Sequence, residues 1–350
     1  MVEIKKNKKK LIIFLNGGTG NQLFQLLACE NIAKIHNRDP FYSEHFLGGI
    51  RNLETADAAS KLGINKISHS QLIGMKLIEE KSLCYPPLFN MYPEYDLLPD
   101  EDLILSGFFQ NYRMHSQFAV DNLREFFFNF KIPSFLKGEN FISLHLRELH
   151  ASTGSNPLET VDNLSIKYYK RAIDLIDEDI NLNKKIGIKK AILFTDMFKD
   201  KSKSLLYKPI RKLLESKGYE VILGDDLCKN TLEIIALMSR ANFVICSNST
   251  FSWWGAYMSN GKKICPIFSF WETNLLTPDN WIQIHDGNKN PKTWHKLNIY
   301  NKNIIKTKTY LGRVGFFKKL KLVLKQKINR KLLWSFFYKY NSLKIKSIIS

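Results

Sequence analysis

A glycine-rich segment near the start of the chain has the composition of an anion-binding loop. Gly18 and Gly20 precede Asn21 and Gln22, between a short apolar run and a helical pattern. Glycines at such a junction let the backbone approach a ligand closely, and the N-terminus of a helix favours negative charge. The third glycine of the dinucleotide-binding fingerprint is missing. From the residues alone, a plain tight turn is therefore as good an interpretation as a ligand loop.

A second candidate segment contains His145 and Arg147, where an apolar run of strand length ends. Residues two apart on a strand share one face, so both side chains are expected to point the same way. An arginine at the carboxyl end of a strand suits phosphate oxygens, because its guanidinium is a charged, fixed fork of donors. The alternative is a salt bridge at the rim of the sheet, with Glu148 or another acid.

A third candidate segment begins with Asn248, Ser249 and Thr250, before a helical pattern that contains Trp253 and Trp254. Small hydroxyl groups together with the backbone N–H groups of a helix start can hold a pyrophosphate. The same residue types are ordinary helix caps. We expect the two tryptophans to pack in the core and not to form a platform for a sugar ring.

The elements that must position these residues are clearest after residue 140, where apolar runs alternate with helical patterns. The expected strands are 141–146, 191–195, 219–223, 242–247 and 263–268, and the expected helices are 166–179, 202–216, 231–239 and 251–259. This alternation predicts a parallel sheet covered by helices on both faces. Ligands bind such sheets beyond the carboxyl ends of the strands, which is where the second and third segments lie.

The first part of the chain is less informative. We expect a strand at 11–16 and a helix at 21–36, and we leave the order of elements in 37–135 open. The run at 11–16 follows several lysines but is too short for a signal peptide or a membrane span. The five cysteines form no Cys-x-x-Cys pair, so we predict buried, reduced thiols and neither a disulfide framework nor a zinc site. That usage is typical of a reducing compartment.

The positive charge is concentrated in a C-terminal tail. Residues 287–350 hold 15 Lys, two Arg and no acidic residue, against a net charge of +19 for the whole chain, so the rest is close to neutral. Lysines and large apolar residues are mixed through 314–340, which favours a basic amphipathic helix on an anionic bilayer. A solvated or packed extension is the alternative. A nucleic-acid-binding protein is disfavoured, because the basic residues form one tail and no nucleic-acid motif is present.

Taken together, the three segments resemble the bacterial galactoside alpha-1,2-fucosyltransferases, glycosyltransferase family 11. The strongest match is the run 248–256, Asn-Ser-Thr-Phe-Ser-Trp-Trp-Gly-Ala, which fits the family's motif almost letter for letter. The start at 17–25 and the pair Thr195 and Asp196 also match, in the family's order, and the likeness spans about residues 11–272. The family's His-x-Arg-Arg-x-Asp motif is matched only in part, since Glu148 and His150 replace its second Arg and its Asp.

The resemblance implies a GT-B-like α/β fold with two Rossmann-like domains that face a cleft. Residues 11–135 would bind the acceptor and 140–285 would bind GDP-fucose, while the composition of 287–350 predicts a membrane-associating tail. The implied reaction is an inverting transfer of L-fucose to O2 of a galactose, with no metal and no other cofactor. The acceptor would be a glycan. Docking of the basic tail would suit a lipid-linked oligosaccharide as acceptor and would place a cytoplasmic protein at the inner face of the cell membrane.

The resemblance also implies roles for individual residues. Arg147, with the backbone N–H groups near Ser249 and Thr250, would stabilise the charge that grows on the β-phosphate. His145 and Glu233 would bind the guanine edge, and Asn21 would assist across the cleft. The full expected donor-binding set is Gly18, Gly20, Asn21, Gln22, His145, Arg147, Asp196, Glu233, Asn248, Ser249 and Thr250. The general base is open, with Glu148 and His150 as candidates.

Several alternatives remain at this point. The altered motif at Glu148 and His150 leaves open another GDP-sugar or another acceptor. The triplets 100–102 and 177–179 spell Asp-x-Asp, the pattern of metal-dependent glycosyltransferases, but one lies in a turn beside a proline and the other in a helical run. We therefore expect neither to bind a metal. A catalytically inactive sugar-binding relative is the remaining possibility outside enzymes and nucleic-acid-binding proteins.

Overall fold

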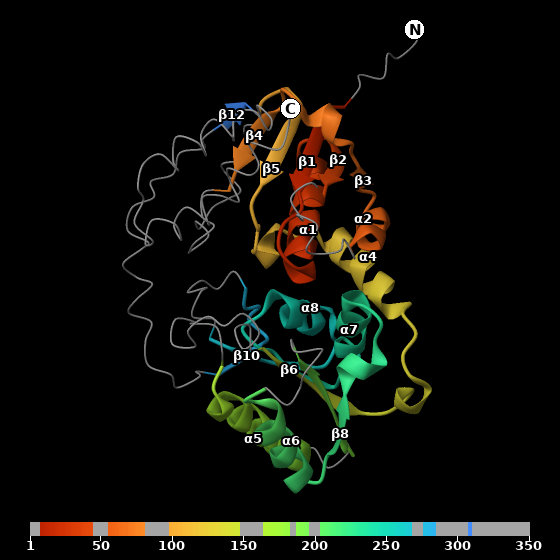
Figure 1. The fold of residues 1–350 in the computed structure, drawn as a ribbon, viewed down its shortest axis with the longest axis vertical. Coiled ribbons are helices and arrows are strands. Elements are labelled where there is room, and N and C mark those ends of the chain that lie inside the picture. The colour runs from red at the N-terminus through yellow and green to blue at the C-terminus, as the bar shows by residue number, and fades with distance from the viewer. Residues whose placement is uncertain are drawn as a thin grey trace, which may run out of the picture. The chain divides into compact units, whose positions relative to one another are not determined.

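A computed structural model describes residues 8–44, 55–80, 98–147, 164–182, 187–195, 204–267, 276–284 and 307–309. The chain divides into two α/β units, each with its own six-stranded sheet (Figure 1). The first comprises Met1–Asn122 and Asn298–Ser350, and the second Leu123–Leu297. Two largely parallel sheets confirm the predicted α/β class.

The first unit is built on β1 and the helix that follows it. Its elements are β1 (Lys10–Phe14), α1 (Thr19–Ile35), β2 (Asp39–Ser43), α2 (Ala56–Lys61), β3 (Asn65–Lys66), η1 (His69–Leu72), β4 (Lys76–Glu79), β5 (Leu103–Ser106), η2 (Tyr112–Met114), the start of α4 (Gln117–Phe128) and β12 (Thr307–Thr309). The sheet order is β12-β4-β5-β1-β2-β3, and only β12 is antiparallel to its neighbour. The strand order reverses between β1 and β5, because β2 and β3 are added on one side of β1, and β5 and β4 lie on the other.

Burial explains why β1 and α1 could be predicted from sequence. Leu11, Ile12 and Ile13 have no exposed surface, as expected for a parallel strand covered on both faces. Helix α1 is likewise buried almost all round, including the polar residues Gln22 and Gln25. Buried amides need hydrogen-bond partners, and these two find them at the carboxyl edge of the sheet.

The second unit has the strand order of a doubly wound dinucleotide-binding fold. Its elements are β6 (Phe141–Leu146), α5 (Ile166–Leu182), β7 (Lys190–Thr195), α6 (Tyr207–Ser216), β8 (Glu220–Leu223), η6 (Gly224–Leu227), α7 (Thr231–Met238), β9 (Phe243–Ile245), α8 (Thr250–Met258), β10 (Lys262–Pro266) and β11 (Ile282–Ile284), after the short helix η3 (Ser134–Leu136). The order β11-β10-β9-β6-β7-β8 is entirely parallel and reverses between β6 and β9. This reversal is the topological switch point, where such folds bind ligands.

Helices cover both faces of the second sheet. Ile142, Leu144 and Leu146 of β6 pack with buried residues of α5 and α6, and α7 and α8 lie on the opposite side (Figure 1). The predicted helix at 202–216 is corrected at its start, since α6 begins at Tyr207. Leu206 is the N-cap, and Ser204 Oγ accepts the N–H of Tyr207, the first helical residue, at 2.8 Å. Among the described residues, no helix is long and apolar enough to cross a membrane.

Candidate functional site

A buried histidine–serine contact joins the two strands at the switch point of the second sheet. His145 Nδ1 lies 2.6 Å from Ser247 Oγ, and the exposed fractions of the two residues are 2% and 0%. His145 is in β6 and Ser247 follows β9, so the contact spans the position where the strand order reverses. The ring of His145 also packs against Phe251, with centroids 5.5 Å apart.

Ser252, on the first turn of α8, fixes the shape of the segment after β9. Its Oγ accepts the Ser247 N–H at 3.1 Å and donates to the Ser249 carbonyl at 3.2 Å. Ser249 in turn is the N-cap of α8, because its Oγ accepts the Phe251 N–H at 3.2 Å. The expected capping role of this segment is therefore confirmed. Ser247 and Ser252 were not predicted, although both belong to or adjoin the run that carries the family resemblance.

Two adjacent tyrosines of α5 hold the ends of β6 and β9 from the other face of the sheet. Tyr169 Oη donates to the His145 carbonyl at 3.0 Å, and Tyr168 Oη donates to the Cys246 carbonyl at 2.7 Å. Both tyrosines are completely buried. Each strand end at the switch point is thus fixed by a phenol, a feature that no local pattern in the sequence indicated.

Arg147 follows β6 directly, on the same face as His145. Its Nε is buried and has no hydrogen-bond partner within the described part of the chain. An unsatisfied buried donor costs about 1–3 kcal/mol, and a bound anion would remove that cost. The predicted alternative, a salt bridge to Glu148, falls outside the described residues, as do Glu148, His150 and Asp196 themselves.

The end of β7 is held by an acid that sequence analysis missed. Asp225, in η6, accepts the Thr195 N–H at 3.1 Å and the Thr195 hydroxyl at 2.8 Å. The carboxylate therefore orders the residue that immediately precedes Asp196. The buried position of Thr195 and its separation of 30 residues from Asp225 explain why the pair was not evident in the sequence.

Glu233 has a structural role at the start of α7. Its backbone N–H donates to the Asn230 side chain at 2.9 Å, and its own Oε2 accepts the Lys229 N–H at 2.7 Å. The first bond caps the helix, with Asn230 as the N-cap, and the second holds the carboxylate against the backbone just before the cap. Binding of the guanine edge by Glu233 stays a prediction, and the carboxylate would have to serve both purposes.

The switch point of the first sheet is joined by amide side chains of α1. Gln25 accepts the Asn16 N–H at 2.9 Å, after β1, and donates to the Gly107 carbonyl at 2.7 Å, after β5. Gln110 Nε2 donates to Asn21 Oδ1 at 2.7 Å. The two loops beyond β1 and β5 are therefore connected by side chains in the same way as the loops beyond β6 and β9.

Gln22 ties the glycine-rich loop to a residue before α2. Its Nε2 donates to the Gly17 carbonyl at 3.1 Å, and its Oε1 accepts the Thr55 hydroxyl at 2.7 Å. Gly17 has φ +77°, and a Cβ there would lie 2.4 Å from Asn21 Nδ2, so only glycine fits. The glycine-rich segment therefore forms a tight turn, and Gly18 is the N-cap of α1. The same turn is the candidate ligand loop.

The structure groups the described candidate residues by unit. His145, Arg147, Asn248, Ser249 and Thr250 lie at the switch point of the second sheet, and Gly18, Gly20, Asn21 and Gln22 lie at that of the first. The tryptophan pair is core, as predicted. Trp253 and Trp254 are buried, and Trp253 Nε1 donates to the Leu276 carbonyl at 2.5 Å.

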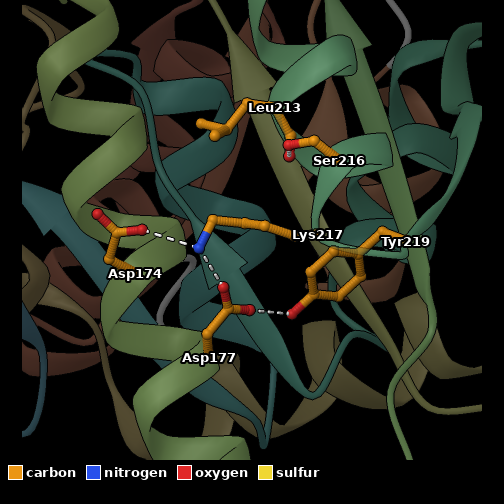
Figure 2. Close-up of polar contacts among 6 residues, drawn as sticks. All are labelled: Asp174, Asp177, Leu213, Ser216, Lys217 and Tyr219. Carbon is orange, nitrogen blue, oxygen red and sulfur yellow. Dashed lines mark hydrogen bonds and ion pairs between the residues drawn. The ribbon is translucent and has the colours of Figure 1, made fainter.

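Acids of both Asp-x-Asp triplets take part in structural contacts. Lys217 Nζ lies 2.5 Å from Asp177 and 2.9 Å from Asp174, and Tyr219 Oη donates to Asp177 at 2.6 Å (Figure 2). In the other triplet, Asp102 accepts the Lys10 N–H at 2.8 Å. Within the described ranges, no group of three or more His, Cys, Asp or Glu side chains could hold a metal ion.

Comparison with known proteins gives one related sequence of known class. No protein-family model matches the chain. Over 150 residues it is 29% identical to the O-antigen biosynthesis glycosyltransferase WbnK of Escherichia coli, and this match covers 41% of the chain and 45% of that protein. The chain is therefore matched to less than half the length of this relative.

Solved structures show only weak overall similarity. The fucosyltransferase NodZ from Bradyrhizobium has a TM-score of 0.40 at 13% identity, covering 73% of this chain and 94% of NodZ. A family 9 glycosyl transferase from Veillonella parvula has a TM-score of 0.39 at 11% identity, covering 85% of this chain and 93% of its own. TM-scores below 0.5 do not establish a shared fold, so the architecture rests on the strand orders given above.

Proposed function

We propose that the protein is a glycosyltransferase that moves L-fucose from GDP-fucose to a hydroxyl group of a glycan. The observation that carries the proposal is the buried Nε of Arg147, without a described partner, at the switch point of a doubly wound sheet. A ligand with phosphate oxygens is what such a position favours. The motif run 248–256 and the similarity to an O-antigen glycosyltransferase support this class of reaction.

The proposed chemistry assigns the leaving group to the second unit. The acceptor hydroxyl attacks the anomeric carbon of the donor as GDP leaves, through a transition state with oxocarbenium character. Negative charge then grows on the β-phosphate. Arg147 provides a permanently charged fork of donors there, and the start of α8 provides a positive helix end. The Ser249 N–H is not among these donors, because it already donates to the Ser247 carbonyl at 2.8 Å. In this proposal neither a metal nor another cofactor takes part.

Rigidity at the switch point suits this role. The bonds from Tyr168, Tyr169 and Ser252 fix the strand ends and the segment beyond β9 before any ligand arrives. Preorganised donors stabilise developing charge more effectively than donors that must reorient. His145 lies in the same network through Ser247, and we place it beside the nucleotide.

The acceptor and the location of the protein are proposed on other grounds. We place the acceptor at the carboxyl edge of the first sheet and propose O2 of a galactose as the attacking group, following the family resemblance. Lysines in the tail 287–350 would hold the protein at an anionic membrane surface, where a lipid-linked oligosaccharide is available. We propose no nucleic-acid partner.

A donor screen tests the proposal. Purified protein is incubated with GDP-fucose, other GDP-sugars and UDP-sugars, together with galactose-terminated acceptors, and release of free nucleotide is measured with and without EDTA. We expect release from GDP-fucose in the presence of acceptor, unchanged by EDTA. Loss of activity in EDTA with recovery in manganese contradicts the metal-independent mechanism.

Thermal melts separate the rival functions. GDP at about 100 times its dissociation constant stabilises the protein by about 2.7 kcal/mol. Stabilisation by UDP-sugars but not GDP would overturn the donor assignment. Stabilisation by GDP-fucose without any turnover indicates a sugar-binding relative, and retention of RNA or DNA on a filter without any response to GDP indicates a nucleic-acid-binding protein.

A further inference from the structure

A buried glutamate lies at the carboxyl edge of the first sheet, outside every motif described above. Glu80 directly follows β4, and its backbone N–H donates to the Ser106 carbonyl at the end of β5 at 2.6 Å. Its exposed fraction is 8%. Acids are rarely buried unless paired, so this position calls for an explanation.

Two backbone amides converge on one oxygen of this carboxyl group. Glu80 Oε2 accepts the N–H groups of Phe108 at 2.6 Å and of Phe109 at 2.9 Å. Gly107 makes this approach possible, because a Cβ there would lie 2.2 Å from the Cβ of Glu80 and 2.4 Å from its Oε2. The carboxyl group and the segment 107–109 are therefore fitted to each other.

The segment held by Glu80 has a strained backbone. Phe109 has φ +50°, in the left-handed region that residues other than glycine seldom adopt, and its side chain is fully buried. Strain of this kind persists only where the surroundings enforce it, and it occurs often at functional sites. Here the enforcing groups are the Glu80 carboxyl group and the buried position of the ring.

The strained residue leads directly into a candidate site residue. Gln110 follows Phe109, and its Nε2 donates to Asn21 Oδ1 at 2.7 Å. The Gly107 carbonyl accepts from Gln25, which also accepts the Asn16 N–H. Both loops at the switch point of the first sheet therefore depend on the conformation of 107–110.

We infer that Glu80 is a positioning residue, whose ionised carboxylate holds 107–110 so that Gln110 fixes Asn21 at the switch point of the first sheet. This inference rests on the proposed function, since it assigns Asn21 and Gln110 to the part of the site where the acceptor reacts. It predicts that the ionised form supports turnover better than the neutral form, because hydrogen bonds to a charged acceptor are stronger.

Burial raises the pKa of Glu80 to about 7, and the two amide donors oppose that rise. Among the described side chains, charged groups on the surrounding elements make contacts of their own. Lys76 of β4 pairs with Glu101, Asp102 accepts the Lys10 N–H, Glu30 of α1 accepts from Ser116, and His115 packs against Phe24. Burial is therefore the main cause of the raised pKa.

The test compares wild type with Glu80→Gln, and uses Glu101→Gln as a matched control with the same chemical change at a more exposed site. Hydrogen exchange of the peptide containing the Phe108 and Phe109 amides is measured at pH 6, 7 and 8 and corrected for intrinsic exchange. Turnover of GDP-fucose is measured over the same range. Gly107→Ala is the second variant, since it keeps the carboxyl group and displaces it.

We expect protection of the two amides at pH 8 to be about tenfold lower in Glu80→Gln than in wild type, as for loss of one charge-assisted bond. Turnover should fall by a similar factor at pH 8, with a smaller difference from wild type at pH 6 and an unchanged KM for the donor. Gly107→Ala should lose protection at every pH, and Glu101→Gln should match wild type.

Wild-type protection and a wild-type pH profile in Glu80→Gln would overturn the inference. If no donor is turned over by any form of the protein, the proposed function fails. The exchange measurement then still decides whether Glu80 holds the segment, so the two failures are distinguishable.

Discussion

Replacing Glu80 by Gln should make the protein more stable at high pH. Ionising a buried carboxyl group removes a charge from water, and the two amides at Oε2 only partly compensate, which is why the pKa rises from 4.5 to about 7. Glutamine has the same shape and never carries the charge, although its carbonyl oxygen is a weaker acceptor for the Phe108 and Phe109 N–H groups than an ionised carboxylate. Its amide would take the place of Oε1.

The sign and the size of the effect follow from linkage. The pKa of this group is higher in the folded state than in the unfolded state. Between these two pKa values the folded state therefore binds more protons than the unfolded state. Glu80 therefore contributes stability that is fully present below about pH 4.5 and is lost as the pH rises through about 7. One pKa unit corresponds to about 1.36 kcal/mol. Ionisation of Glu80 therefore lowers the unfolding free energy of the wild type by about 3 kcal/mol at pH 8.

Urea denaturation of wild type and Glu80→Gln at a series of pH values measures this difference. The gap in unfolding free energy should grow in favour of the variant from pH 5 to pH 8, towards about 3 kcal/mol. His115, whose pKa burial lowers to about 3, makes both proteins less stable as the pH falls below about 6.5, so its effect cancels in the comparison. A gap that is independent of pH would refute the reasoning, as would a variant that is less stable at pH 8.

Three other predictions concern the second unit and the tail. Arg147→Ala should lower turnover by about 10²–10³ with folding intact, and Arg147→Lys should recover little because a point charge does not replace the fork; near-wild-type kinetics in Arg147→Ala would remove the donor-site assignment. Tyr169→Phe should cost about 1 kcal/mol in unfolding free energy and weaken GDP binding several-fold, as measured by calorimetry, and unchanged affinity would show that its bond to the His145 carbonyl does not position the site. Truncation after residue 312 should abolish pelleting with anionic vesicles and spare GDP binding, and equal pelleting of both forms would contradict a membrane role for the tail.

The second unit could be predicted from sequence because its strands are continuous apolar runs. The predicted strand 141–146 coincides with β6, since every residue of that strand is buried. Helix α6 was predicted less well, because the apolar pattern begins at Ser202 whereas the helix begins at Tyr207, where Ser204 Oγ accepts the backbone N–H. In the first unit such a run marks β1, but β2 and β3 lack one. Strand β3 has only two residues, both exposed, and β2 contains Pro40, so neither has a pattern that identifies it.

The candidate site shows the same division between local and distant information. Helix capping at Ser249 and the position of Arg147 follow from a few neighbouring residues. The contact between Gln110 and Asn21 spans 89 residues, and that between Glu80 and Phe108 spans 28. Such pairs depend on which strands become neighbours in the sheet, and a single sequence does not give that order for 37–135.

The position of β12 has a consequence for the order of synthesis. The strand at Thr307–Thr309 pairs with β4 at the edge of the first sheet, roughly 200 residues after β5 has been made. At 5–20 residues per second, β4 lacks this partner strand on the ribosome for roughly 10–40 s, while the second unit is made. An uncovered edge strand is a template for pairing with other chains. A nascent chain halted before Thr307 would therefore be more prone to aggregate than one halted just after Thr309.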